Sequence, residues 1–327
     1  MPKQSNYDFH LKNLKGLVKD FKYLQKIPGF PLSNKNFFYS RDDESGWWMA
    51  TKQIIIRKYI GLYLNILGAK KDIDLFFIDL LGSWGMNRVS KRNQVDTFEF
   101  PGTSISAPLI SNRKKRGFTE FFVNDLDREK REVLIKRYKA LNTYSNNRLV
   151  YNIPVPDLND IDSNEWVIDV LNQIRYKYQS KIHCLFVIDN QGMDINLSTI
   201  RKIREITPFA DFVITFHDVA YGRGMHSKKI EEFIGTKVKP KTKREDLYAL
   251  YIEQLKSVGI GRIEPIRIYS GNSFYYTLLF CCRNQIDAKW LNTIKRYSDV
   301  RFRSWTAENN KQIWDVIEGK IISLDSF

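Results

Sequence analysis

Residues 74–85 read DLFFIDLLGSWG, an apolar run that ends in an acid and passes into a turn with two glycines. An uninterrupted apolar run of this length is typical of a strand buried on both faces of a parallel sheet. Asp79 stands at its carboxyl end, where open α/β sheets bind their ligands. Gly82 and Gly85 allow the backbone to turn sharply and to approach a ligand closely. The stretch predicts the first βα unit of a nucleotide-binding sheet, although a strand followed by a Gly-containing turn also occurs without a ligand.

Further strands and helices alternate on either side of this unit. A helix over residues 47–67 precedes it, and residues 86–117 predict a long polar connection after it, interrupted by residues 106–110. We then expect strands at 118–123, 149–153, 182–188 and 212–216, and helices at 128–140, 164–178, through Ile200 and Ile203, and at 244–258.

The last two apolar runs, residues 262–269 and 274–282, lie too close together for a crossover helix and predict an antiparallel hairpin. Five strands that alternate with helices and end in a hairpin do not follow the order of a dehydrogenase. They follow the order of a class I methyltransferase sheet, whose last strand inserts antiparallel.

The sequence divides into three expected parts. Residues 1–45 form a basic helical extension with a helix over 10–26, residues 46–300 form the methyltransferase-like domain, and residues 301–327 form a helical tail.

The net charge of the 327-residue chain is +15, and a field of this sign attracts polyanions. The basic residues cluster in runs at 113–116 and 237–244, with a third group at 295–303. We therefore expect a nucleic-acid partner, DNA or RNA; the alternative is a surface whose lysines are merely solvated. The residues expected to hold the nucleic acid are Arg113, Lys114, Lys115, Arg116, Lys237, Lys239 and Lys241. These two runs follow the first and fifth strands, so both are expected beside the ligand-binding edge of the sheet.

The cysteines and histidines suggest no metal chemistry. Cys184, Cys281 and Cys282 lie inside apolar runs without paired spacing, as core thiols of a reducing compartment do. Four histidines with no cluster at ligand spacing predict no metal site, and His183 on an apolar strand is expected in the core. No apolar run is long enough for a signal peptide or a membrane span, so we expect a cytoplasmic protein without a membrane partner.

A series of short motifs runs through the chain from about Trp47 to Tyr297. In order and spacing they resemble the three-Cys-motif partner proteins, a branch of the Rossmann-like methyltransferases encoded beside a three-cysteine-motif protein. The matching segments are residues 52–67 (entry helix), 79–85 (Gly turn), 106–109 (helix start), 125–127 (acidic step), 157–159 (Asp-x-Asn step), 189–192 (Asp-x-x-Gly) and 275–282 (final strand).

This resemblance implies a doubly wound sheet of order 3-2-1-4-5-7-6 and an S-adenosylmethionine-dependent methyltransferase that acts on nucleic acid, with the neighbouring three-Cys-motif protein as a further candidate partner. Asp79 would face the methionine ammonium, and the amides around Gly82 and Gly85 its carboxylate. The remaining cofactor residues implied are Asp125 and Asp127 on the ribose side, where each could instead be a helix cap, and Asp157 near the adenine amino group.

The acceptor side is implied to consist of Asp189, Asn190 and Gln191, whose oxygens would accept hydrogen bonds from an exocyclic amine. Asp189 is expected to converge with Asp79 and Asp125 at one edge of the sheet. Two departures from the family pattern bear on activity. Ser83 and Trp84 replace the small residues of the Gly turn, and Asn190 and Gln191 replace a proline and an aromatic. The competing hypothesis is therefore a catalytically degenerate subunit that keeps the fold and binds nucleic acid or a protein.

Overall fold

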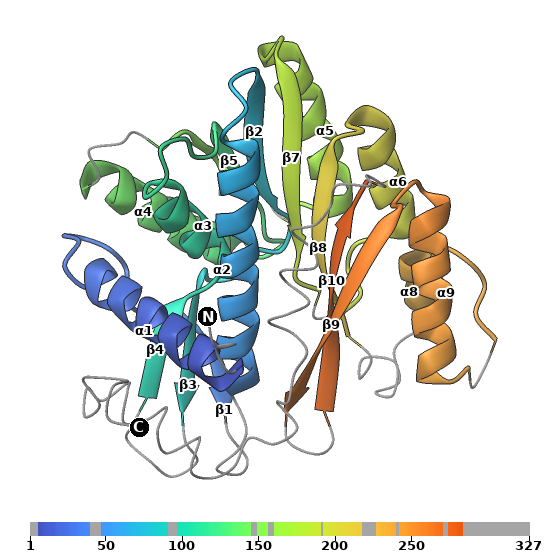
Figure 1. The fold of residues 1–327 in the computed structure, drawn as a ribbon, viewed down its shortest axis with the longest axis horizontal. Helices are drawn as coiled ribbons and strands as arrows, with labels where there is room; N and C mark the ends of the chain where they lie inside the picture. Colours follow the sequence, from blue (N-terminus) through green and yellow to red (C-terminus); the bar gives the residue numbers. More distant parts are fainter. Residues whose placement is uncertain are drawn as a thin grey trace, which may run out of the picture.

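The computed structural model describes residues 6–39, 47–90, 97–144, 149–155, 160–190, 192–217, 227–239, 242–270 and 274–283. These ranges contain a seven-stranded sheet with helices on both faces and a smaller three-stranded sheet (Figure 1). The strands of the large sheet are β2 (Ile73–Asp79), β5 (Glu120–Val123), β6 (Tyr151–Asn152), β7 (Lys181–Ile188), β8 (Ala210–Phe216), β9 (Arg262–Ser270) and β10 (Phe274–Cys282).

The strand order of the large sheet is β6-β5-β2-β7-β8-β10-β9. Numbered by their place in the chain, the seven strands follow the order 3-2-1-4-5-7-6. Strands β2, β5, β6, β7 and β8 pair in parallel, whereas β10 pairs antiparallel with both β8 and β9. The predicted fold class and the antiparallel terminal hairpin are therefore confirmed.

Each face of the large sheet carries its own apolar core, because successive side chains of a strand point to opposite faces. Leu75 and Phe77 of β2 join the core under α2, α3 and α4. Phe76 and Ile78 join the opposite core, under α5, α6, α8 and α9. The helices are α2 (Trp47–Leu67), α3 (Thr103–Ser111), α4 (Arg128–Tyr144), α5 (Ser163–Lys177), α6 (Leu197–Ile206), α8 (Ser227–Ile234) and α9 (Arg244–Ser257).

The smaller sheet corrects one expectation, because residues 86–117 are not a polar connection. They contain β3 (Met86–Ser90), β4 (Thr97–Pro101) and helix α3. β3 and β4 pair antiparallel and bury Phe98 and Phe100, while β1 (Asn36–Tyr39) adds to β3 in parallel. Because β1 comes from a distant part of the chain, the local pattern of residues 86–117 could not reveal it.

Helix α1 (Asn6–Leu24) lies against α2 and β4. Its Asp20 is fully buried and forms ion pairs with Arg57 of α2 and with Arg113, which follows α3. The predicted helix at 10–26 is thus present with an earlier start. The expected tail at 301–327 and the basic group at 295–303 lie outside the described residues.

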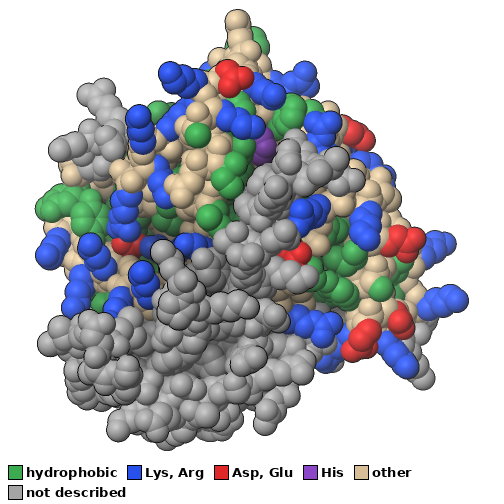
Figure 2. Space-filling view, in the orientation of Figure 1, with side chains coloured by type: hydrophobic (Ala, Val, Ile, Leu, Met, Phe, Trp, Pro, Cys, Tyr) green, Lys and Arg blue, Asp and Glu red, His purple; other side chains and the backbone are tan. Residues whose placement is uncertain are grey.

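Lys and Arg side chains are spread over the face of the molecule seen in Figure 2, with fewer Asp and Glu between them. In the part of the chain that the structure describes, no helix combines the length and the apolar character that a membrane span requires.

Candidate functional site

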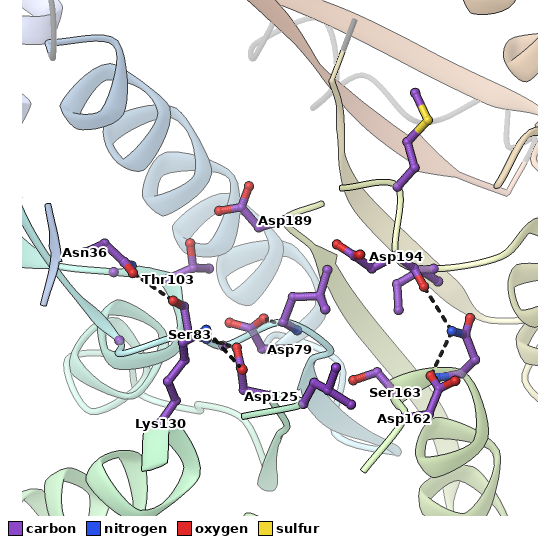
Figure 3. Close-up of a pocket in the computed structure, with 18 of the residues that line it drawn as sticks. Asn36, Asp79, Ser83, Thr103, Asp125, Lys130, Asp162, Ser163, Asp189 and Asp194 are labelled. Atoms are coloured by element: carbon purple, nitrogen blue, oxygen red, sulfur yellow. Dashed lines mark hydrogen bonds and ion pairs between the residues drawn. The ribbon is translucent and has the colours of Figure 1, made fainter. Parts of the chain in front are cut away.

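A cavity of about 620 Å³ opens at the carboxyl ends of the central parallel strands (Figure 3). Asp79, Asp125 and Asp189, which follow or end three different strands, all line it. The expectation that these carboxylates converge at one edge of the sheet is confirmed. Gly82, Ser83 and Gly85 line the same cavity, together with residues that the sequence did not single out: Asn36, Gln53, Asn87, Thr103, Lys130, Asp162 and Asp194.

Asp79 lies at the end of β2 and is only 2% exposed. Burial raises the pKa of its carboxyl group to about 8, and the nearby carboxylates Asp189 and Asp125 add to this rise, whereas the Leu81 amide and Lys52 oppose it. Among the described residues no cation forms an ion pair with Asp79. A cation bound next to Asp79 would therefore favour the ionised form of this carboxyl group.

The turn after β2 is tightly built. Gly85 has φ +70°, and a Cβ there would lie 2.8 Å from Leu134 and 2.9 Å from Ile105. The turn amides already have partners inside the protein. Gly82 N donates to Asn124 O at 2.7 Å, Ser83 N to Asp125 Oδ2 at 2.9 Å, and Gly85 N to Gly82 O at 3.1 Å. These three amides are therefore not available to a ligand's carboxylate, contrary to the expectation for Gly82 and Gly85.

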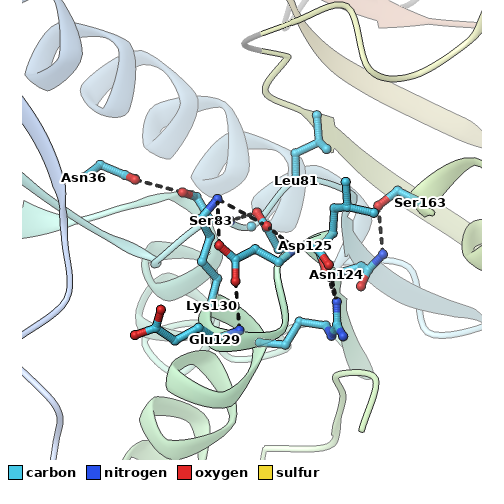
Figure 4. A network of polar contacts seen from close by, with 12 residues as sticks. Asn36, Leu81, Ser83, Asn124, Asp125, Glu129, Lys130 and Ser163 are labelled. Carbon is cyan, nitrogen blue, oxygen red and sulfur yellow. Dashed lines mark hydrogen bonds and ion pairs between the residues drawn. The ribbon is translucent and has the colours of Figure 1, made fainter. Parts of the chain in front are cut away.

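Asp125 holds this turn in place from the next strand (Figure 4). Its Oδ2 accepts from Ser83 N, and its Oδ1 accepts from Asp127 N at 3.0 Å and from Lys130 Nζ at 3.4 Å. Asp127 does not line the cavity; its carboxylate accepts from Glu129 N at 2.9 Å at the start of α4. Asp127 therefore acts as the helix cap that the sequence left open as its alternative role.

Asp189 follows β7, and a buried lysine fixes its carboxylate. Lys52 Nζ lies 2.8 Å from Oδ1 and 2.6 Å from Oδ2, and Thr215 Oγ1 donates to Oδ1 at 2.8 Å. Lys52 is 3% exposed and also lies over the ring of Tyr276. No signal in the sequence points to this pair, because Lys52 lies on α2, far along the chain from residue 189.

The side chain of Asn190 stabilises its own loop and does not line the cavity. Its side chain is fully buried, and its Oδ1 accepts from the amides of Asp194 and Ile195 at 3.1 and 3.3 Å. The expectation that this side-chain oxygen accepts from a substrate amine is wrong, because backbone groups already use it. Gln191 and Asp157, also predicted for the site, lie outside the described residues.

Trp84 does not line the cavity, so its indole does not narrow it. Its backbone oxygen accepts a hydrogen bond from Arg137, which also donates to the carbonyls of Pro31 (2.8 and 2.9 Å) and Asn34 (2.8 Å). Burial lowers the pKa of this guanidinium to about 9. Arg137 thus joins the N-terminal segment to the turn after β2.

The start of α5 supplies a further wall of the cavity. Asp162, the N-cap residue, accepts from Asn164 N at 2.8 Å, and both line the cavity together with Ser163. Asp162 followed three residues later by Glu165 is a recognisable helix start. From this signal, the sequence could have predicted that the start of α5 lies at the carboxyl edge of the sheet, after the third strand.

The two basic runs lie in different places. Arg116 donates to the carbonyls of Lys70 and Ile73, so residues 113–116 lie at the amino edge of the sheet, away from the cavity. The expectation that this run lies beside the cavity is wrong, because helix α3 carries the chain back across the sheet. Lys237 instead lines a smaller cavity of about 460 Å³ that shares Lys228 and Glu232 with the main one, and Lys241 lies outside the described residues.

The other titratable groups belong to the core. His183 pairs with Tyr63 Oη at 2.8 Å, and burial lowers its pKa to about 3, as a core histidine would show. Cys184, Cys281 and Cys282 are buried free thiols. Within the described ranges no group of three or more His, Cys, Asp or Glu side chains is arranged to hold a metal ion.

No protein-family model matches the chain, and no curated protein is similar to it in sequence. Solved structures that are similar in shape include the following three. Protein LPL1258 from Legionella pneumophila aligns with TM-score 0.47 and 10% identity over 76% of this chain and 90% of its own. Human methyltransferase-like protein 13 in complex with SAH aligns at 0.39 and 14% over 77% and 91%. The O-methyltransferase from Bacillus cereus in complex with SAH aligns at 0.37 and 12% over 84% and 91%. At these scores the fold assignment rests on the strand order alone.

Proposed function

We propose that the chain is an S-adenosylmethionine-dependent methyltransferase. The observation that carries this proposal is the cavity at the carboxyl edge of a sheet with the methyltransferase strand order. Although the chain is basic overall, the cavity walls carry more carboxylates than ammonium groups. The charged lining residues are Asp79, Asp125, Asp162, Asp189, Asp194 and Glu232 against Lys130, Lys228 and Lys229. Such a lining favours a ligand with positive charge.

The buried carboxyl group of Asp79 supports the same ligand class. An uncompensated carboxylate inside a protein is costly, and its raised pKa of about 8 reflects that cost. An ammonium group placed against Asp79 would offset the cost on binding. S-adenosylmethionine carries such an ammonium and, when bound, supplies an electrophilic methyl group on a sulfonium sulfur.

The protein's contribution to methyl transfer would be positioning, since attack on a sulfonium requires little acid-base assistance. Asp189 is the group placed to orient the acceptor. It lines the cavity, its carboxylate is held by Lys52 and Thr215, and its side chain remains 21% exposed. A hydrogen bond from the acceptor to Asp189 Oδ2 would direct the acceptor's lone pair toward the methyl group. The carboxylate of Asp189 could then take up the acceptor's proton.

We further propose a nucleic-acid acceptor, as for the three-Cys-motif partner proteins that the motifs resemble. The net charge of +15 supports it, as do Lys228, Lys229 and Lys237 around the two adjoining cavities. A target base inside a duplex would have to be flipped out to reach Asp189.

A catalytically degenerate subunit is the second candidate. The observation that favours it is Asn190, whose side-chain oxygen is consumed by its own loop. Such a subunit would bind nucleic acid, or a three-Cys-motif protein, without transferring a methyl group.

Thermal unfolding with and without ligand tests the proposal. S-adenosylmethionine and S-adenosylhomocysteine, each at a hundredfold excess over its Kd, should stabilise the fold by about 2.7 kcal/mol, and ATP at the same concentration should not. If both cofactor forms stabilise the protein but no methyl group reaches DNA or RNA, the degenerate subunit is favoured. If neither form raises the Tm at millimolar concentration, the methyltransferase proposal is wrong.

A further inference from the structure

The end of the cavity between β1, β3 and the start of α3 differs from the rest, because its walls are polar but uncharged. We name this end the amide corner and define it by Asn36, Gln53, Asn87, Gly102 and Thr103. Figure 3 shows Asn36 and Thr103 together at this end, with the labelled aspartates farther along the cavity. In an otherwise acidic cavity, the amide corner is where a negative group meets the least repulsion.

Hydrogen-bond donors of the amide corner remain available. Asn36 Nδ2 donates to Asn87 Oδ1 at 3.2 Å, which leaves its second hydrogen for another acceptor. Asn87 is 3% exposed, and its Nδ2 is buried without a hydrogen-bond partner. That nitrogen lies beside Gly102, within 3.4 Å of the point that a Cβ on Gly102 would occupy. A buried amide nitrogen without an acceptor is costly unless a ligand supplies one.

The start of α3 adds a second kind of donor. Gly102 is the N-cap residue of this nine-residue helix, and no side chain caps its first turn. The first amides of a helix have no partner within the helix and attract negative groups. Gly102 and Thr103 both line the cavity. The Gly102 amide already donates to Gly85 O at 2.8 Å, so the amide that this helix start presents at the cavity wall is that of Thr103.

Three amides of the turn after β2 cannot replace these donors. The amides of Gly82, Ser83 and Gly85 already donate to Asn124, Asp125 and Gly82. A carboxylate bound near Asp79 therefore needs other donors, and the amide corner supplies uncharged donors in the wall of the same cavity.

We infer that the amide corner binds the carboxylate of the cofactor's methionine moiety, with its ammonium group against Asp79. This inference rests on the proposed function and assigns the orientation of the ligand. It gives the N-terminal segment a direct role, because Asn36 belongs to β1 and reaches the cavity by accepting from Ser83 Oγ at 2.8 Å.

Comparison of two ligands tests this inference. S-adenosylhomocysteine has the carboxylate, and decarboxylated S-adenosylmethionine lacks it. Asn87→Asp and Asn36→Asp each place a negative charge in the amide corner with little change in shape. Asn87 is buried, so its variant could fail to fold; Asn36 is partly exposed, so its variant keeps the test valid in that case. Asn172→Asp, on an exposed position of α5, is the matched control.

Both corner variants should weaken S-adenosylhomocysteine binding by about tenfold to a hundredfold, the effect of losing a charge-assisted hydrogen bond. Binding of decarboxylated S-adenosylmethionine should change less than about threefold, and the control should leave both ligands unaffected. Equal effects on the two ligands, or no effect on either, would overturn the inference while leaving the proposed function in place. A wild-type protein that binds neither ligand contradicts the proposed function and the amide-corner assignment together.

Discussion

Lys52 Nζ lies 2.6 Å from Asp189 Oδ2, and this contact ties helix α2 to the carboxyl end of β7. Lys52 is almost completely buried, so its charge depends on Asp189 for compensation. The pair sets the direction of the one carboxylate that we place on the acceptor side of the cavity.

Replacing Lys52 by Met should destabilise the fold by about 1–3 kcal/mol, because Asp189 is then left without its counter-ion inside the cavity wall. The double variant Lys52→Met, Asp189→Asn should recover most of that stability, since it leaves no unpaired charge. Urea unfolding of the wild type, both single variants and the double variant gives the coupling. Additive effects would show that the two side chains do not depend on each other.

Asp79 makes stability depend on pH in a direction unusual for a carboxylate. The pKa of its carboxyl group is about 8 in the folded chain, whereas the ordinary value for Asp is 3.8. Between pH 3.8 and pH 8 the folded state therefore keeps a proton on Asp79 that the unfolded state has lost. The contribution of Asp79 to the free energy of unfolding therefore falls as the pH rises through that window.

We expect Asp79→Asn to raise the Tm at pH 8 by about 1–2 °C, the shift that ~1 kcal/mol produces in a chain of 327 residues, and to have little effect at pH 5. Asp127→Asn, at the exposed helix cap, is the control and should change the Tm at neither pH. An Asp79→Asn protein with a lower Tm than the wild type at pH 8 would contradict the raised pKa.

The fold could be predicted from sequence because the strands are apolar runs separated by helices of clear period, and the terminal hairpin determined the strand order. The cavity could be predicted in part, since parallel strands deliver Asp79, Asp125 and Asp189 to one edge. Pairings between distant segments could not be predicted. The contacts of Lys52 with Asp189 and of Asn36 with Ser83 depend on how α2 and β1 pack in the fold. Such packing between distant segments is not visible in any local pattern of the sequence.

The same limit explains the misplaced basic run. Sequence order places residues 113–116 after the first strand, but helix α3 returns the chain to the amino edge before them. Lys237 and Lys239 follow α8, whose first residues line the cavity. Of these two runs, only the second therefore has residues near the candidate site.

This difference predicts the outcome of two charge reversals. Lys237→Glu with Lys239→Glu should weaken binding of a single-stranded oligonucleotide and flatten its salt dependence by about 0.7 for each phosphate that the variant no longer neutralises. Lys114→Glu with Lys115→Glu carries the same change in charge at the amino edge and should have a smaller effect. Fluorescence anisotropy at several salt concentrations measures both, and equal reductions in affinity would show that only the net charge matters.

The N-terminal helix should contribute strongly to stability. Asp20 is the shared partner of Arg57 and Arg113, and Arg57 is largely buried. Asp20→Ala should destabilise the fold by about 3–5 kcal/mol, because it leaves a buried guanidinium without its counter-ion. Asp72→Ala, at an exposed position, should change stability by less than about 0.5 kcal/mol. A destabilisation below about 1 kcal/mol for Asp20→Ala would show that α1 is only loosely attached.

Calorimetric titration of the wild type with S-adenosylhomocysteine, at several pH values and in buffers of different ionisation enthalpy, tests the central claim most directly. At pH 7 the carboxyl group of Asp79 is mostly protonated in the free protein, because its pKa is about 8. An ammonium group against it favours the ionised form and lowers that pKa, so binding at pH 7 should release a proton. The affinity should therefore rise as the pH increases from 6.5 and level off above about 8. Absence of binding, or binding without proton release and with the same affinity at every pH, would contradict the assignment of this cavity to the cofactor.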